Sequence, residues 1–210
     1  MNPFIINLGR QLGSGGREIG KALATHYQIA FYDKELIRLA SEESGVNAEF
    51  FEKSDERTRR NICGGIFGMR FPFTGDGNVG QHSYLDSDSL FKIQSDVIRH
   101  LAAEGSGIFV GRCADYILRD HPRTLSIFIS ATEEDRLQRI SRQYNLNEQK
   151  AKSLMEEADR KRADYYNFYS LKKWGHASSY DLCINSSVLG MEQTIEYLCS
   201  FIDRRFQIQK

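Results

Sequence analysis

Hydrophobic and polar positions along the chain change their period several times, and each change marks the border of an expected element. Residues 4–8 (FIINL) form a short apolar run that ends before a glycine, as a buried strand does. Beyond the glycine-rich stretch, apolar side chains recur at helical spacing from Arg17 onward. The start of the chain therefore predicts a strand, a glycine loop and a helix whose buried face carries Ile19, Ala22, Leu23 and Tyr27.

The same alternation continues to the C-terminal part of the chain. Further strands are expected at 29–32, 107–111, 124–130 and 180–185. Further helices are expected at 33–43, 88–104, 132–144, 147–173 and 191–204. Strands that alternate with helices indicate an α/β fold, in which a parallel sheet carries helices on both faces.

One stretch departs from this pattern. Residues 61–80 (NICGGIFGMRFPFTGDGNVG) are rich in glycine and contain a proline, so they cannot form a long helix. They are expected to form a loop within an irregular insert at about 46–87. Their aromatic side chains distinguish them from a plain linker, and the loop could order on substrate binding or pack against a second subunit, as in a homodimer.

The loop at 9–20 (GRQLGSGGREIG) is the first candidate for chemistry. A loop that joins a strand to a helix exposes backbone N–H groups at the positive end of the helix dipole, and these attract phosphate. Glycines let the backbone approach the anion closely. The residues expected to form this cradle are Gly13, Ser14, Gly15 and Gly16.

The loop departs from the usual phosphate-binding pattern G-x-x-x-x-G-K-[ST]. Gly16 occupies the position of the lysine, and Arg17 and Glu18 follow where a hydroxyl residue is expected. Arg10 and Arg17 flank the cradle, and either could supply the positive charge that the lysine normally gives. The alternative is a glycine turn that binds nothing.

Composition narrows the classes of partner. The 210 residues include 28 Lys and Arg and 28 Asp and Glu, a balance that argues against a general nucleic-acid binder. No apolar run approaches the length of a membrane span, and the first residues do not resemble a signal peptide. The four cysteines lie far apart, which indicates reduced thiols and a cytoplasmic protein rather than a disulfide framework or zinc site.

Four segments occur in an order found in a known family: FIINLGRQLGSGGREIGKALA, GIFVGRCADYIL, LSIFISATEEDRLQRI and YDLCINSS. The chain resembles the cytidylate kinase-like family, a branch of the P-loop nucleoside monophosphate kinases, over about 4–45 and 88–202. The most specific parts of the resemblance are the glycine loop and the Gly-Arg pair after the third strand. The segment near 46–87 carries no matching motif.

The resemblance implies a three-layer α/β/α fold with a five-stranded parallel sheet. It also implies a single P-loop kinase-like domain over 1–210, with an acceptor-side insert at about 46–87 and a helical lid at about 146–175. ATP and Mg²⁺ would bind at the first loop. A small-molecule acceptor, with CMP or dCMP as the first candidate, would bind opposite.

Residue roles follow from the same resemblance. Arg112 would contact the acceptor phosphate, and Asp33 would help hold the acceptor nucleoside, although Asp33 could equally be a simple helix N-cap. Typical relatives have Gly-Arg-Asp here, whereas Cys113 replaces the aspartate and Asp115 lies two residues later. Asp115 is therefore a further candidate for acceptor binding, and the departure puts cytidine specificity in question.

The lid candidate at 156–175 (EEADRKRADYYNFYSLKKWG) supplies basic side chains. Arg160 and Arg162 are expected to act with Arg17 and Arg112 in stabilising the charge of the transferring phosphoryl group. A solvated basic helix face is the alternative. The metal ligands stay unassigned, with Ser14, Glu18 and Asp115 as candidates.

Two other functions fit the sequence. The chain could phosphorylate a different small molecule, since 46–87 does not look like a compact acceptor domain. It could also bind nucleotide without turnover, as a sensor, and the absence of the loop lysine is the best support for that reading.

Overall fold

The computed structural model describes residues 2–33 and 87–208, with side chains from Phe91 onward in the second range. The insert expected at 46–87, its glycine-rich loop at 61–80 and most of the helix expected at 33–43 lie outside the described residues. The chain divides into two units, one made of 1–33 with 101–210 and the other of 34–100. In the second unit, the structure describes only the helical residues 87–100 of α4 (Ser87–Glu104).

Five parallel strands form one sheet in the order β2-β3-β1-β4-β5. The most apolar predicted strand, β1, is central because it pairs with β3 on one side and β4 on the other. Ile5 of β1 is in register with Gly107 and with Thr124. The strands are β1 (Ile5–Arg10), β2 (Ala30–Tyr32), β3 (Gly107–Val110), β4 (Thr124–Ser130) and β5 (Leu182–Asn185).

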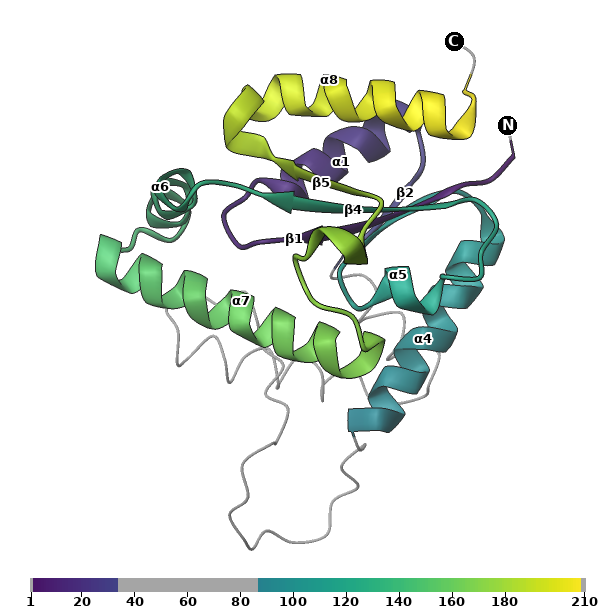
Figure 1. Cartoon of the computed structure of the whole chain (residues 1–210), viewed down its shortest axis with the longest axis horizontal. Helices are drawn as coiled ribbons and strands as arrows, with labels where there is room; N and C mark the ends of the chain where they lie inside the picture. Colours follow the sequence, from purple (N-terminus) through teal and green to yellow (C-terminus); the bar gives the residue numbers. More distant parts are fainter. Residues whose placement is uncertain (1, 34–86, 209–210) are drawn as a thin grey trace, which may run out of the picture. The chain divides into compact units, whose positions relative to one another are not determined.

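Helices cover both faces of this sheet (Figure 1). Helices α1 and α8 lie on one face, and α5 and α7 lie on the other, so the predicted three-layer α/β/α arrangement is confirmed. The helices of this unit are α1 (Gly16–Tyr27), α5 (Ala114–Ile117), α6 (Glu133–Tyr144), α7 (Glu148–Ser170) and α8 (Ser186–Phe206).

The apolar periodicity of the sequence corresponds to the core. Ile19 and Leu23 lie one helical turn apart on α1, and both are fully buried. They pack with Ile6 and Leu8 of β1 and with Leu198 of α8 in one hydrophobic cluster. This cluster fixes α1 against the central strand and so determines where the loop between them lies.

Two helix starts follow from local side-chain chemistry. The Thr132 hydroxyl accepts a hydrogen bond from the Asp135 N–H at the start of α6, as the sequence predicted. The Asn147 side chain accepts from the Lys150 N–H in the same way at the start of α7. Helix α6 ends at Tyr144, and the Asn147 cap starts α7 three residues later. The two are therefore separate helices with a short turn between them.

The sequence predictions differ from the structure in a few places. Helix α5 was not predicted, because four residues are too few to show a helical period. Strand β5 begins at Leu182 rather than at 180. Gly190 has a non-helical conformation within α8, so the regular helix begins at Met191, as expected.

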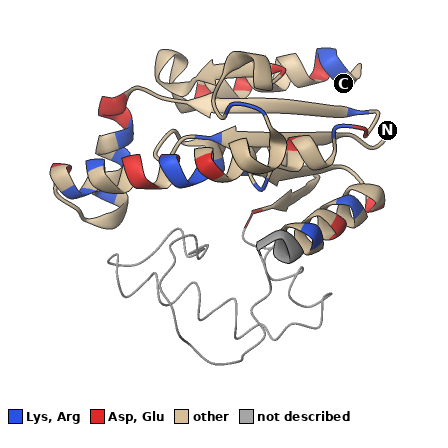
Figure 2. Ribbon diagram, turned by 60° about the horizontal axis from the view of Figure 1, so that its bottom comes forward, with Lys and Arg blue, Asp and Glu red and all other residues tan. Residues whose placement is uncertain are grey.

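Charges of both signs are mixed along α7 (Figure 2). Among the residues that the structure describes, no helix is long and apolar enough to cross a membrane.

Candidate active site

The glycine loop joins the carboxyl end of β1 to the start of α1. Gly13 and Gly15 adopt left-handed backbone conformations, with φ values of 77° and 75°, which glycine adopts without steric cost. The N-cap residue of α1 is Gly15, which has no side chain to cap the helix. The helix therefore presents the positive end of its dipole at the loop, which is the arrangement that binds phosphate.

Side chains from α6 and α8 hold the outer side of this loop through its carbonyl oxygens. Arg136 Nε donates to Leu12 O at 2.7 Å, and Arg139 Nη1 donates to Gly13 O at 2.9 Å. Ser186 Oγ, at the start of α8, donates to Ser14 O at 2.7 Å. The loop backbone is thus fixed before any ligand binds, which reduces the ordering needed for binding.

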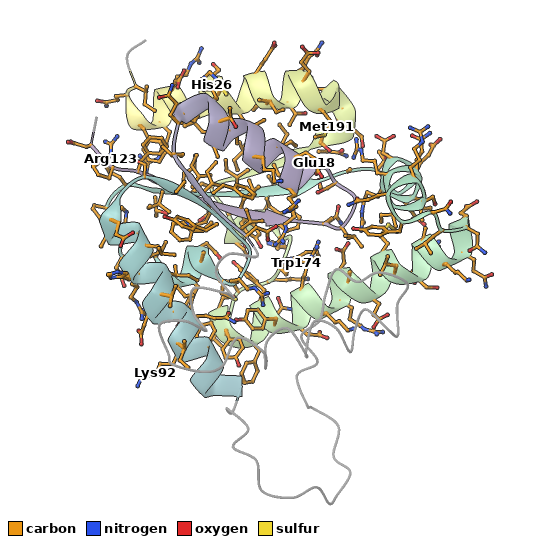
Figure 3. All side chains as sticks on the ribbon, turned by 180° about the vertical axis from the view of Figure 1, so that it is seen from behind. Glu18, His26, Lys92, Arg123, Trp174 and Met191 are labelled. Atoms are coloured by element: carbon orange, nitrogen blue, oxygen red, sulfur yellow. The ribbon has the colours of Figure 1, made fainter. Side chains whose placement is uncertain are left out.

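The Ser14 side chain forms its hydrogen bonds within the loop and so stabilises the loop conformation. Its hydroxyl donates to Gln11 O at 2.9 Å and accepts from the Gly16 N–H at 3.4 Å, and the residue is fully buried. The Met191 sulfur lies against Gly15, so any side chain at that position would collide with it. Figure 3 shows Met191 and Glu18 beside the end of α1 that adjoins the glycine loop.

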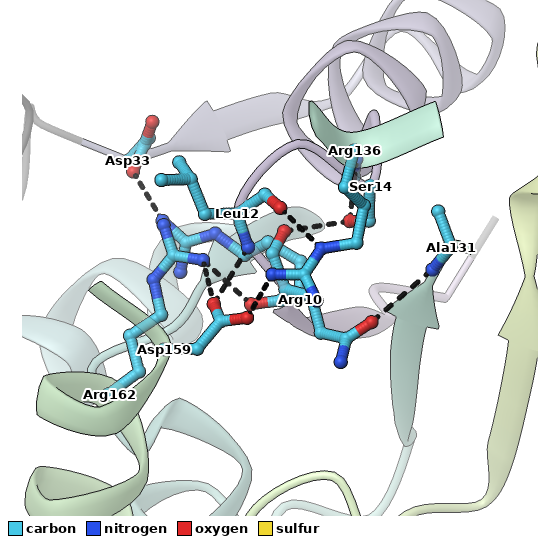
Figure 4. A network of polar contacts seen from close by, with 10 residues as sticks. Arg10, Leu12, Ser14, Asp33, Ala131, Arg136, Asp159 and Arg162 are labelled. Carbon is cyan, nitrogen blue, oxygen red and sulfur yellow. Dashed lines mark hydrogen bonds and ion pairs between the residues drawn. The ribbon is translucent and has the colours of Figure 1, made fainter. Parts of the chain in front are cut away.

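Helix α7 reaches the loop through Asp159. The Asp159 carboxylate accepts from the Leu12 N–H at 2.8 Å and forms ion pairs with Arg136 and Arg162. Arg162 Nη1 also donates to Arg10 O at 2.9 Å (Figure 4). The predicted lid helix therefore contacts the loop backbone directly.

A second aspartate forms ion pairs with both arginines that flank the loop. Asp33 follows β2, and its two oxygens lie 3.5 Å from Arg10 Nη2 and 2.7 Å from Arg17 Nε. The Arg10 side chain is 14% exposed, whereas the Arg17 side chain is 45% exposed. Asp33 is thus the ionic partner of both flanking arginines, a role that the sequence did not predict.

We call these six side chains the arginine–aspartate cluster: Arg10, Arg17, Arg136, Arg162, Asp33 and Asp159. Within it, four guanidinium groups face two carboxylates, which leaves an excess of two positive charges.

Burial is unfavourable for this excess charge. Burial lowers the pKa of Arg10, the charges of Arg112 and Arg17 lower it further, and Asp33 opposes the shift. The pKa of Arg162 is lowered by burial first and then by the charge of Arg10. A bound anion would reduce the cost of burying these charges, because an opposite charge favours the ionised form of a guanidinium.

Arg112 lies in a strained turn at the end of β3. Gly111, Arg112 and Cys113 all have positive φ values, of 74°, 59° and 56°, and the Ala114 N–H closes the turn on Gly111 O at 3.2 Å. A left-handed conformation costs a non-glycine residue about 1 kcal/mol or more. Such strain is found at functional sites, and the role of Arg112 stays a prediction.

The structure separates the other predicted site residues. Asp115 is buried and accepts from the Tyr166 hydroxyl at 2.7 Å, with Lys172 Nζ 3.7 Å away. Burial raises the pKa of the Asp115 carboxyl, and its hydrogen bond from Tyr166 opposes that shift. Arg160 is on the exposed face of α7, whereas the Arg162 side chain is only 10% exposed and points to the loop.

Asp159, Arg136 and Arg139 were not predicted as parts of the loop site. The available signal was the string EEADRKR, which mixes three acidic with three basic residues and which sequence reasoning assigns to a solvated helix face.

The architecture is the P-loop kinase fold: a five-stranded parallel sheet with helices on both faces and a glycine loop between the first strand and the first helix. The sequence model of the cytidylate kinase-like family matches residues 5–188, and the chain belongs to this family. A comparison with curated proteins gave no match.

Solved structures agree with this fold. An uncharacterised protein from Eubacterium ventriosum is 28% identical, with 95% of this chain and 98% of that chain covered and a TM-score of 0.69. Shikimate kinase from Bacteroides thetaiotaomicron is 14% identical, with 95% and 98% covered and a TM-score of 0.52, and shows the fold alone. The family supports a nucleotide-dependent kinase that acts on a small molecule.

Proposed function

We propose that the protein transfers the γ-phosphoryl group of ATP to a nucleoside monophosphate, with CMP or dCMP as the first candidate. The observation that carries this proposal is the excess positive charge of the arginine–aspartate cluster, whose Arg10 side chain reaches from the glycine loop to the turn that holds Arg112. Phosphoryl transfer depends mainly on positioning and charge neutralisation, and such a cluster supplies both.

The proposed reaction needs no general base. An oxygen of the acceptor phosphate, ionised near neutral pH, forms a bond to the γ-phosphorus. The bond from this phosphorus to the β–γ bridging oxygen breaks, and ADP leaves with the electron pair. Within this proposal the loop residues Gly13, Ser14, Gly15 and Gly16 hold the ATP phosphates with Arg10 and Arg17.

Arg112 binds the acceptor phosphate in this proposal, since a guanidinium can bind phosphate through two parallel hydrogen bonds. Arg162 stabilises charge from α7 while it also holds the loop backbone. Arg160 remains a proposed partner that would need a movement of α7, because it lies on the exposed face of the helix. Asp33 positions Arg10 and Arg17 beside the ATP phosphates through its two ion pairs. Asp33 and Asp115 stay proposed contacts of the acceptor, and Asp115 lies two residues after Cys113 of the strained turn.

Mg²⁺ fits this site as an ion carried mainly by ATP. Magnesium is usually held by one or two carboxylates together with substrate phosphates. Among the side chains that the structure describes, in 2–33 and 91–208, no three His, Cys, Asp or Glu side chains gather as a metal site. Glu18 offers an exposed carboxylate on the first turn of α1, and it would contact the ion there. When bound, Mg²⁺ neutralises charge on the phosphates.

ADP formation from ATP and Mg²⁺ against a panel of acceptors tests the proposal. The panel holds CMP, dCMP, UMP, AMP, GMP and several non-nucleotide alcohols. Turnover with CMP or dCMP is the expected result. Turnover only with an alcohol would replace the proposed acceptor, and no turnover with confirmed ATP binding would favour a non-catalytic sensor.

The cellular location and the oligomeric state of the protein are also proposals. We propose a cytoplasmic enzyme, on the basis of its cysteines. Cys113 and Cys199 are buried free thiols, and Cys183 is an exposed free thiol. A homodimer stays a proposal, and size-exclusion chromatography with light scattering would test it.

A further inference from the structure

The two positions that define a phosphate-binding loop are exchanged in this chain. In the pattern G-x-x-x-x-G-K, glycine is the first residue and lysine the seventh. Aligned on Gly15, the first position is Arg10 and the seventh is Gly16. The cation and the small residue have therefore changed places, with the loop length unchanged.

The structure gives a steric reason for this exchange. A Cβ atom added to Gly16 would lie 2.7 Å from Arg10 Cβ and 3.2 Å from Arg10 Cγ. Real Cβ atoms essentially never approach another atom as closely as the first of these distances. The stem of Arg10 thus occupies the space that a side chain at 16 needs, so only one of the two positions can carry a long cation.

The rest of the Arg10 side chain runs across the carboxyl edge of the sheet. Its guanidinium lies 3.5 Å from Asp33, beyond β2, and it packs against Gly111 at the end of β3. A side chain at Gly111 would collide with Arg10 Nη1. The guanidinium therefore lies between the glycine loop and the Arg112 turn, where two phosphate groups would meet.

Arg17 is the other flanking arginine, and its position differs. It lies on α1, it is 45% exposed, and Asp33 holds it through Nε at 2.7 Å. Arg10 is 14% exposed, and its longer ion pair of 3.5 Å leaves it the more weakly held of the two. Of the two arginines, Arg10 is the one that a Cβ atom added to Gly111 would meet.

We propose that Arg10 replaces the loop lysine: it enters the phosphate site from the last residue of β1 and contacts the ATP phosphates on the side that faces Arg112. This assignment rests on the proposed function. Arginine is a planar fork with several donors, so one guanidinium can contact the donor phosphates and the transferred group together.

The test restores the usual loop. R10G and G16K are made separately and together, and the affinity for ADP with Mg²⁺ is measured by isothermal titration calorimetry. R10G is expected to weaken binding by about tenfold or more, because a hydrogen bond to a charged group is lost. G16K alone is expected to weaken binding because its side chain displaces Arg10. The double variant is expected to recover affinity to within about threefold of wild type, a non-additive result that direct contact predicts.

R119G is the matched control. Arg119 is exposed and contacts Tyr116 and Asp120, so its removal is expected to leave ADP affinity unchanged. Circular dichroism and thermal unfolding establish that each variant is folded. If R10G does not fold, R10Q and R10K take its place, with weaker binding expected for R10Q and near-normal binding for R10K.

Each other outcome has a definite meaning. ADP affinity that is unchanged in R10G overturns the assignment of Arg10 and leaves the proposed function intact. Weak binding by the double variant, or full binding by G16K alone, overturns the claim that the two positions share one space. Wild-type protein that binds no ADP overturns both this assignment and the proposed function.

Discussion

Single residues determine the charge of the site, and the sequence located some of them better than others. Arg10 and Arg17 could be placed beside the loop from the glycine pattern alone. Asp159 could not, because an aspartate in a helix of mixed charge has the same sequence signature whether it faces solvent or a neighbouring backbone N–H. Arg160 and Arg162 could not be told apart either, since the rotation of α7 about its axis decides which one is buried.

Gly111→Ala tests the position of Arg10 without changing any charge. The added methyl group collides with Arg10 Nη1, and Gly111 has a φ of 74°. We expect kcat/KM to fall about tenfold or more, because displaced catalytic groups commonly cost that much.

Gly105→Ala is the control for this change, since an added Cβ at Gly105 meets no atom within 4 Å. It should leave steady-state kinetics unchanged. Equal activity in both alanine variants would show that the Arg10 guanidinium does not depend on the space above Gly111.

Asp115 gives a prediction on pH. Its folded-state pKa is raised, chiefly by burial. Below the ordinary aspartate pKa of about 4, folded and unfolded chains both hold the proton. As the pH rises above this value the unfolded chain loses its proton first, so stability falls until the folded pKa is passed.

Asp115→Asn removes this loss, and its amide oxygen can still accept from Tyr166. Thermal unfolding at several pH values should show the variant gaining stability over wild type as the pH rises from 4 to about 7. A difference in Tm that does not change with pH would contradict the assignment of a raised pKa.

At the scale of elements, the periodicity of apolar positions predicted nearly every strand and helix of the described parts. It could do so because β1 and α1 bury continuous or regularly spaced apolar side chains. It could not show that α7 is tied to the loop. That contact depends on Asp159 and Leu12, which are 147 residues apart in the chain.

Asp159→Asn tests this connection between α7 and the loop. The carboxylate is the buried partner of Arg136 and Arg162. Removing one member of a buried ionic group leaves unpaired charge, so we expect a loss of about 3 kcal/mol in the free energy of unfolding. Urea denaturation followed by circular dichroism measures it.

Asp164→Asn, the same substitution on the exposed side of α7, is the matched control. It should change stability by less than about 0.5 kcal/mol. Similar stability of both variants would mean that Asp159 does not hold α7 to the loop.

For the whole molecule, a formal net charge of zero hides a local excess of positive charge. The sequence excluded a general polyanion binder on that balance, whereas the structure concentrates an excess of positive charge around the glycine loop. The family resemblance, not the composition, supplied the function class. The acceptor side could not be predicted in the same way, because 46–87 matches no motif.

ATP with Mg²⁺ should stabilise the entire fold if it binds at this edge. At a ligand concentration about 100 times the Kd, linkage adds about 2.7 kcal/mol to the free energy of unfolding. For a chain of this length, such a gain corresponds to a rise in Tm of about 5–10 °C. Differential scanning fluorimetry measures it, and an unchanged Tm at saturating ATP would contradict a nucleotide site.

The most direct measurement is the initial rate of ADP formation with CMP as acceptor, for wild type and for Arg112→Ala. The account predicts CMP-dependent turnover by the wild type. It also predicts a rise of about 10- to 100-fold in the KM for CMP in the variant, because a charged hydrogen bond to the acceptor phosphate is lost. Equal KM values in the two proteins, or no turnover by wild type with CMP, would contradict a second phosphate site at Arg112.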